Sequence, residues 1–226
     1  MYVIGIVGRA YFNKDGQKII QTHEATRRFF SNEKEVICIT LLHDDDDNYI
    51  DIVPGNDSVN ESKIDYILDK CDAFIVPGGT YFYHFDEYVI NYAIKKDKPL
   101  LAICLGFQAL CSMFASERIK FDMTTKFKDD SHVGKSDEYI HKVLVKDNTL
   151  LKDILIDDVV PVNSIHHDIV DFDIDILKIN AISKDGIIEG VEYPNKKFIV
   201  GLQWHPEYLN DKYSNRIRDS FIKAIK

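Results

Sequence analysis

Short apolar runs alternate with amphipathic stretches along the first half of the chain. The runs that predict buried strands are 2–8, 35–42, 72–76 and 99–104. Hydrophobic residues at helical spacing predict helices over about 17–31, 63–69, 84–96 and 106–115. Strands that are apolar throughout and alternate with helices indicate a parallel sheet that is covered on both faces.

The second half of the chain is richer in strands. Strand-like segments lie at 139–145, 159–162, 177–183, 187–193 and 198–203, and Lys184-Asp185-Gly186 predicts a turn between two of them. A last amphipathic helix is expected over about 210–225. No Ser/Gly/Pro-rich linker and no repeat interrupts the sequence, so residues 1–226 are expected to form a single domain. Residues 122–137 are expected to form a long loop, a candidate to lie over a site.

Composition narrows the class of protein and its partners. The chain of 226 residues carries 28 Lys and Arg against 37 Asp and Glu, which gives a net charge of −9. This acidic balance argues against binding to nucleic acid or to an anionic membrane surface. The four cysteines form no C-x-x-C pair, and we expect neither a signal peptide nor a membrane span. A cytoplasmic protein is therefore expected.

Cys104 lies where an apolar strand meets a helix, in the segment KPLLAICLGFQALCSMF at 98–114. A nucleophile at such a strand-to-helix elbow is lifted from the carboxyl end of the sheet. It also lies at a helix N-terminus, whose partial positive charge favours a thiolate. The alternative is a buried structural cysteine, and this segment alone does not decide between the two interpretations.

A candidate base follows the last predicted strand. His205 and Glu207 belong to the segment GLQWHPE at 201–207, and in extended chain their side chains project to the same side. The carboxylate can then hold one imidazole nitrogen while the other takes a proton from a thiol, which is the logic of a catalytic triad. The alternative for this segment alone is a surface turn.

Gly78 and Gly79 end another predicted strand, after Val76-Pro77. Backbone N–H groups at tandem glycines can turn toward a developing negative oxygen, and with the amide of Leu105 they would form an oxyanion hole. The alternative for this pair alone is a plain strand-to-helix turn.

Taken together and in this order, the three segments resemble the class I glutamine amidotransferase superfamily, with A-I-C-L-G-F-Q for the nucleophile and Q-W-H-P-E for the base. Within it, the chain is similar to the free-standing γ-glutamyl hydrolases of the γ-glutamyl-GABA hydrolase kind, through VNSIHH at 162–167 and the downstream AISKDGIIEG. The resemblance implies an α/β, flavodoxin-like three-layer sandwich. Its central sheet is mostly parallel, with helices on both faces and a small antiparallel β extension.

The resemblance also implies residue roles. Cys104 would be the nucleophile, His205 the general base and then acid, and Glu207 the carboxylate that orients it. Gly79 and Leu105 would supply the oxyanion amides. Gly78, Gln108, Asn163, His166 and His167 would line the substrate pocket. Because adjacent histidines in extended chain point apart, no metal shared by His166 and His167 is expected, and no cofactor is expected.

Three positions depart from the family pattern. Ala102 stands where glycine is usual, and it fits only if the backbone there keeps a negative φ. Leu105 stands where the γ-glutamyl hydrolase branch commonly has arginine, and Asp168 where that branch usually has glutamine. The second and third departures affect the expected substrate more than the expected reaction.

The leading hypothesis is a cysteine hydrolase that cleaves the γ-glutamyl amide bond of a small γ-glutamyl amine or of glutamine. The first alternative is a glutaminase subunit that supplies ammonia to a separate synthetase, and only this alternative requires a synthetase partner. The second is an inactive binding or regulatory protein on the same scaffold. A homodimer is left open, and neither nucleic acid nor a membrane is an expected partner.

Overall fold

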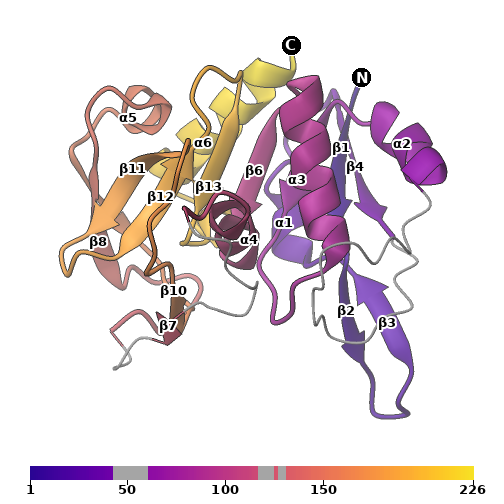
Figure 1. The fold of residues 1–226 in the computed structure, drawn as a ribbon, viewed down its shortest axis with the longest axis horizontal. Coiled ribbons are helices and arrows are strands. Elements are labelled where there is room, and N and C mark those ends of the chain that lie inside the picture. The colour runs from indigo at the N-terminus through magenta and orange to yellow at the C-terminus, as the bar shows by residue number, and fades with distance from the viewer. Residues whose placement is uncertain (43–60, 117–124, 127–130) are drawn as a thin grey trace.

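The computed structural model describes residues 1–42, 61–116, 125–126 and 131–226, and Figure 1 shows how their elements are arranged. Five strands of the central sheet are parallel: β1 (Tyr2–Val7), β4 (Val36–Leu41), β5 (Ala73–Val76), β6 (Leu100–Ile103) and β13 (Ile199–Leu202). Four antiparallel strands extend it: β12 (Ile188–Glu192), β11 (Lys178–Ser183), β8 (His141–Val145) and β9 (Val159–Val162). The sheet order is β4-β1-β5-β6-β13-β12-β11-β8-β9.

The parallel strands follow the flavodoxin-like order. Numbered along the chain, they lie side by side as 2-1-3-4-5. Val76 of β5 pairs with Ala102 of β6, and Leu202 of β13 pairs with Ile103 of β6, so three strands end at the same edge. The predicted α/β fold, with a mainly parallel sheet and an antiparallel extension, is confirmed.

Helices cover both faces of the sheet, as the apolar strands predict. One face carries α2 (Glu61–Asp69), α3 (His84–Lys96) and α4 (Leu105–Met113), and the other carries α1 (Glu24–Arg28), α5 (Leu150–Leu155) and α6 (Lys212–Ile225) (Figure 1). In β6, Leu101 and Ile103 pack in the core beneath α5 and α6, whereas Leu100 and Ala102 pack beneath α3 and α4. Each face of β6 is therefore buried, which explains why its sequence shows no polar alternation.

The predicted helix over 17–31 is wrong for most of its length. The structure instead forms a hairpin of β2 (Arg9–Phe12) and β3 (Lys18–Gln21), and only Glu24–Arg28 is helical. The Asn13 side chain accepts hydrogen bonds from the backbone N–H groups of Asp15 and Gln17, and Gly16 adopts a φ of 76°. These are the interactions of a tight turn, and they outweigh the helical spacing of the apolar residues.

The antiparallel half contains short elements that the sequence did not predict. These are α5, η1 (Pro206–Tyr208), and the pair formed by β7 (Thr125–Lys126) with β10 (Asp168–Ile169). Of the predicted loop 122–137, residues 122–124 and 127–130 lie outside the described part of the chain. Residues 131–137 lie beside 163–166, since Gly134 N donates to Ser164 O at 2.9 Å. Among the described residues, no helix has the length and apolar character needed to cross a membrane.

Candidate active site

Cys104 occupies a strained position between β6 and α4. Its backbone has φ 50° and ψ −105°, a conformation that residues with a side chain rarely adopt. Cys104 N donates to Leu202 O of β13 at 2.8 Å, and its carbonyl oxygen accepts from Gln108 N of α4 at 3.0 Å. The sheet and the helix thus hold the thiol at the carboxyl edge of the parallel strands, as the elbow predicts.

The close approach of α4 to β5 explains the glycine that follows Leu105. A Cβ atom at Gly106 would lie 2.1 Å from Val76 O, closer than any side chain tolerates. Ala102, by contrast, lies within β6 and is absent from the residues with positive φ. The condition for an alanine at position 102 is therefore met.

His205 and Glu207 reach the same edge from β13. Because Leu202 pairs with Ile103, the segment after β13 emerges next to Cys104. His205 Nδ1 lies 2.8 Å from Glu207 Oε1, and both side chains are almost fully buried. Burial disfavours the imidazolium, but the charges of Glu207 and Cys104 and a hydrogen bond with Cys104 outweigh it, so the pKa of His205 is raised well above its ordinary value.

Asn163 binds the backbone of His205 on both sides. Its Oδ1 accepts from His205 N at 2.9 Å, and its Nδ2 donates to His205 O at 2.8 Å. Asn163 Nδ2 also donates to Ser136 O at 2.5 Å, and the residue is fully buried. The contacts of this predicted pocket residue thus go to the backbone of the candidate base.

The tandem glycines lie against both candidate catalytic side chains. A Cβ atom at Gly78 would lie 2.7 Å from His205 Cε1 and 3.4 Å from Cys104 Cβ. A Cβ atom at Gly79 would lie 3.2 Å from Leu105 Cδ2, which brings the two predicted oxyanion residues side by side. Gly78 is buried and Gly79 is exposed.

Arg9 binds the backbone of this glycine turn, and no sequence motif predicts this role. Its Nε donates to Gly78 O at 3.2 Å, and its Nη2 donates to Pro77 O. Its Nη1 donates to both carboxylate oxygens of Asp86 in α3 at 2.7 Å. Both side chains are buried, so the turn is fixed by an ion pair between β2 and α3.

The remaining predicted pocket residues lie around Asp168. Gln108 Nε2 donates to Asp168 O and to Gln203 Oε1, each at 3.1 Å. His166 Nδ1 lies 3.0 Å from the same Asp168 O. His166 is buried whereas His167 is exposed, so the adjacent imidazoles do not share an environment, as extended chain predicts.

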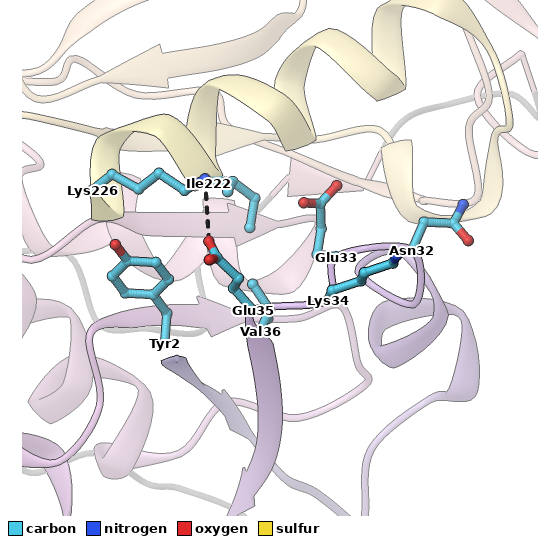
Figure 2. A pocket seen from close by; sticks show the side chains of 8 residues that line it. All are labelled: Tyr2, Asn32, Glu33, Lys34, Glu35, Val36, Ile222 and Lys226. Carbon is cyan, nitrogen blue, oxygen red and sulfur yellow. Dashed lines mark ion pairs between the residues drawn. The ribbon is translucent and has the colours of Figure 1, made fainter.

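A separate pocket lies at the opposite edge of the sheet. Figure 2 shows the side chains that line it, among them Tyr2, Glu35 and Lys226, with an ion pair between Lys226 Nζ and Glu35 Oε2 at 3.6 Å. Tyr2 begins β1, whereas Cys104 follows the end of the parallel strand β6. This pocket is therefore remote from the cysteine and is not part of the candidate active site.

This fold, with a cysteine, a histidine and a glutamate brought together at the carboxyl edge of its sheet, is that of a class I glutamine amidotransferase-like protein. The chain belongs to the Peptidase C26 family, which matches residues 52–207. Membership of this family, together with a relative named as a γ-glutamyl-γ-aminobutyrate hydrolase, supports hydrolase activity.

Two relatives agree with this assignment. The protein PB2B2.05 of Schizosaccharomyces pombe, whose name describes a glutamine amidotransferase, is 36% identical over 141 residues, which cover 61% of this chain and 55% of that protein. The γ-glutamyl-γ-aminobutyrate hydrolase PuuD of Escherichia coli K12 is 29% identical over 152 residues, which cover 61% of this chain and 58% of that protein. The match therefore spans little more than half the length of each relative.

A solved structure shows the same fold. The glutaminase domain of Trypanosoma brucei CTPS, with bound acivicin, has a TM-score of 0.65 at 18% identity, covering 100% of this chain and 94% of that chain. At this identity the likeness establishes the architecture alone.

Proposed function

We propose that the chain is a cysteine hydrolase that cleaves the γ-glutamyl amide bond of a small γ-glutamyl compound. The observation that carries the proposal is the arrangement of Cys104, His205 and Glu207, with the imidazole between the carboxylate and the thiol. The substrate class is supported by the relative PuuD, whose name is that of a γ-glutamyl-γ-aminobutyrate hydrolase.

In the first half of the proposed reaction, the Cys104 thiolate attacks the γ-carbonyl carbon, and the carbonyl electron pair moves onto its oxygen. The amides of Leu105 and Gly79 would stabilise this oxyanion, since the first N–H groups of α4 have no partner within the helix. His205 then donates its proton to the departing nitrogen. The C–N bond breaks, the amine or ammonia leaves, and a γ-glutamyl thioester remains on Cys104.

In the second half, neutral His205 removes a proton from water, and the resulting hydroxide attacks the thioester carbon. The C–S bond breaks, glutamate is released, and the Cys104 thiolate and the His205 imidazolium are restored. Glu207 stabilises the imidazolium in both halves because its carboxylate accepts a hydrogen bond from Nδ1–H of His205. The proposed reaction steps use no cofactor.

Gln108, Asn163, His166 and His167 remain proposed substrate contacts or their supports. His167 is exposed, so its side chain is available to a ligand. Gln108 lies on the first turn of α4, close to Cys104, and its amide is held by Asp168 O and Gln203. Gly78 would border the substrate beside the imidazole.

The test is glutamate release from glutamine and from a panel of γ-glutamyl amines, measured with the wild-type chain and with Cys104→Ala. We expect release with the wild-type chain and its loss in the variant. Cys38→Ser is a matched control, because burial raises the pKa of Cys38 to about 11 and keeps that thiol protonated. A glutamine-like electrophile should label Cys104 in the control and label nothing in Cys104→Ala.

A second candidate function is that of a glutaminase subunit that passes ammonia to a separate synthetase. It is favoured by a sequence relative, the CTP synthase of Staphylococcus haemolyticus, which is 26% identical over 196 residues that cover 74% of this chain and 36% of that protein. This function predicts slow glutamate release by the chain alone and faster release when a synthetase is added. Labelling without turnover on any γ-glutamyl compound, with or without a synthetase, would instead support a binding or regulatory protein.

A further inference from the structure

Four metal-ligating side chains meet in the antiparallel half of the fold. His132 lies in the segment before β8, His141 opens β8, His166 lies between β9 and β10, and Glu189 lies in β12. One donor atom from each side chain lies within 4.8 Å of all the others. His132, His166 and Glu189 are buried, and His141 is nearly so.

The distances from Glu189 to the three imidazoles are close to those between donors around a tetrahedral metal ion. Glu189 Oε1 lies 3.1 Å from His132 Nδ1, 3.5 Å from His166 Nε2 and 3.7 Å from His141 Nε2. Donors at ~2.1 Å from a central Zn²⁺ would lie about 3.4 Å from one another. The last two distances are too long for good hydrogen bonds, so direct N–H···O bonding does not explain them.

The outer nitrogens of two imidazoles are already engaged. His132 Nε2 lies 3.0 Å from Asp185 Oδ2, and His166 Nδ1 lies 3.0 Å from Asp168 O. Both partners are acceptors, so a neutral ring that donates its proton to the outer partner turns a lone pair toward Glu189. Histidines that bind metals are held by carboxylates and backbone carbonyls in this way.

Several polar atoms at the centre of the cluster make no hydrogen bond within the described part of the chain. Glu189 is fully buried, and neither of its carboxylate oxygens has a hydrogen-bond donor among the described residues. His166 Nε2 and both ring nitrogens of His141 likewise lack a hydrogen-bond partner within the described part of the chain. A buried carboxylate is stable when it is paired or coordinates a metal.

We propose that His132, His141, His166 and Glu189 together bind one divalent transition-metal ion, with Zn²⁺ as the occupant that the donor set favours. Three imidazoles and one carboxylate suit Zn²⁺ and not Mg²⁺ or Ca²⁺, which prefer oxygen ligands. Four protein ligands in a buried site form a closed, structural centre. The sequence predicted no metal shared by His166 and His167, because adjacent histidines in extended chain point apart. The proposed site uses only His166 of this pair, and its other ligands come from distant segments.

This centre would also support the candidate active site. Asp168 O lies within hydrogen-bond distance of His166 Nδ1 and accepts from Gln108 Nε2 of α4. The metal would fix the position of His166, and Asp168 would connect that position to the helix that begins beside Cys104. We therefore expect the ion to stabilise the fold around the nucleophile and to take no part in bond cleavage.

The test uses the whole chain, purified without a histidine tag and stripped with a chelator. Titration with Co²⁺ should give one bound ion per chain and the intense visible absorption of a tetrahedral site, and Zn²⁺ should displace the Co²⁺. Zn²⁺ should also raise the Tm of the stripped chain by binding linkage. Neither measurement depends on hydrolase activity, so the two proposals can fail separately.

Variants locate the ion within the chain. Glu189→Gln and His141→Ala should abolish the Co²⁺ spectrum. Asp185 is the outer partner of His132, so Asp185→Asn should weaken metal binding by about 10-fold to 100-fold. His167→Ala, the exposed neighbour of His166, is the matched control and should bind normally. A folded wild-type chain that binds neither ion, or equal loss in His167→Ala and Glu189→Gln, would overturn the proposal. If Glu189→Gln does not fold, the wild-type titration alone decides.

Discussion

Gly78 lies directly against the imidazole of His205, with space for a hydrogen atom and none for a methyl group. A Cβ atom at this position would lie 2.7 Å from His205 Cε1 and 3.4 Å from Cys104 Cβ. The glycine turn after β5 therefore fixes how closely the candidate base can approach the candidate nucleophile. This contact with the imidazole requires a glycine at position 78, whether or not the Gly78 amide also binds the oxyanion.

Gly78→Ala should push the His205 ring away from Cys104 and lower kcat. A misplacement of about 1 Å at a catalytic group can reduce the rate by roughly 100-fold, and we expect a loss of that order. Gly79→Ala is the comparison, because its Cβ would lie 3.0 Å from the Arg9 side chain and 3.2 Å from Leu105 Cδ2, and not against the His205 ring. Steady-state kinetics on one γ-glutamyl substrate would measure both variants. Equal kcat for Gly78→Ala and the wild-type chain would show that this contact does not position the base.

The raised pKa of His205 predicts where activity falls at alkaline pH. Burial alone would lower this pKa, but interactions with Glu207 and Cys104 together raise it. The imidazolium that protonates the leaving nitrogen should therefore persist above pH ~6.5, the ordinary histidine value. The alkaline limb of kcat/KM should lie correspondingly high. The same shift makes protonation of His205 stabilise the fold below pH ~6.5, and this contribution is lost as pH rises through the folded-state pKa.

Glu207→Gln tests that assignment. Removing the carboxylate charge should lower the pKa of His205, move the alkaline limb to lower pH and reduce kcat, on the order of 10²-fold to 10⁴-fold. The pH profile of kcat/KM for the variant and the wild-type chain is the measurement. An alkaline limb that stays at the same pH in Glu207→Gln would mean that another group supplies the proton.

Local motifs carried most of what the sequence predicted about the site. Cys104 lies in one strand-to-helix elbow, and His205 and Glu207 are two residues apart, so each piece of chemistry has a short signature. The Arg9–Asp86 pair spans 77 residues and has no such signature, because neither residue type nor spacing indicates burial. The sequence likewise contains no signature of the cluster formed by His132, His141, His166 and Glu189, because only the folded sheet brings these residues together.

The fold was predicted where burial leaves a pattern in the sequence and missed where the chemistry of a turn decides the structure. Apolar runs predicted the central parallel strands β5, β6 and β13 because burial on both faces leaves a strong local pattern. The hairpin at Arg9–Gln21 was missed because its decisive contacts are those of the Asn13 side chain within the turn, which helical spacing does not reveal. Turn chemistry there outweighs the periodicity of the apolar residues.

Asn163→Ala should separate a positioning role from a substrate-binding role. The side chain makes two hydrogen bonds to the His205 backbone, and its loss leaves buried polar groups that each cost about 1–3 kcal/mol of stability. If Asn163 holds the base, kcat should fall while KM changes little. If it instead binds substrate, KM should rise with kcat largely retained, and the positioning role would be excluded. Kinetics and urea unfolding of the same preparation provide both readouts.

The Arg9–Asp86 pair should be costly to break from either side. Arg9→Met leaves the Asp86 carboxylate buried without its guanidinium, and Asp86→Leu leaves the Arg9 charge buried without its carboxylate. Removing one member of a buried pair typically costs about 3–5 kcal/mol, and the double variant Arg9→Met/Asp86→Leu should cost less than the sum of the two single changes. Urea unfolding of the four chains would measure the coupling.

Both Arg9 variants should also lower kcat, because the carbonyls of Pro77 and Gly78 lose the donors that fix the glycine turn. Additive stability changes, or unchanged kcat in a folded Arg9→Met chain, would show that the pair neither couples across β2 and α3 nor positions the turn beside His205.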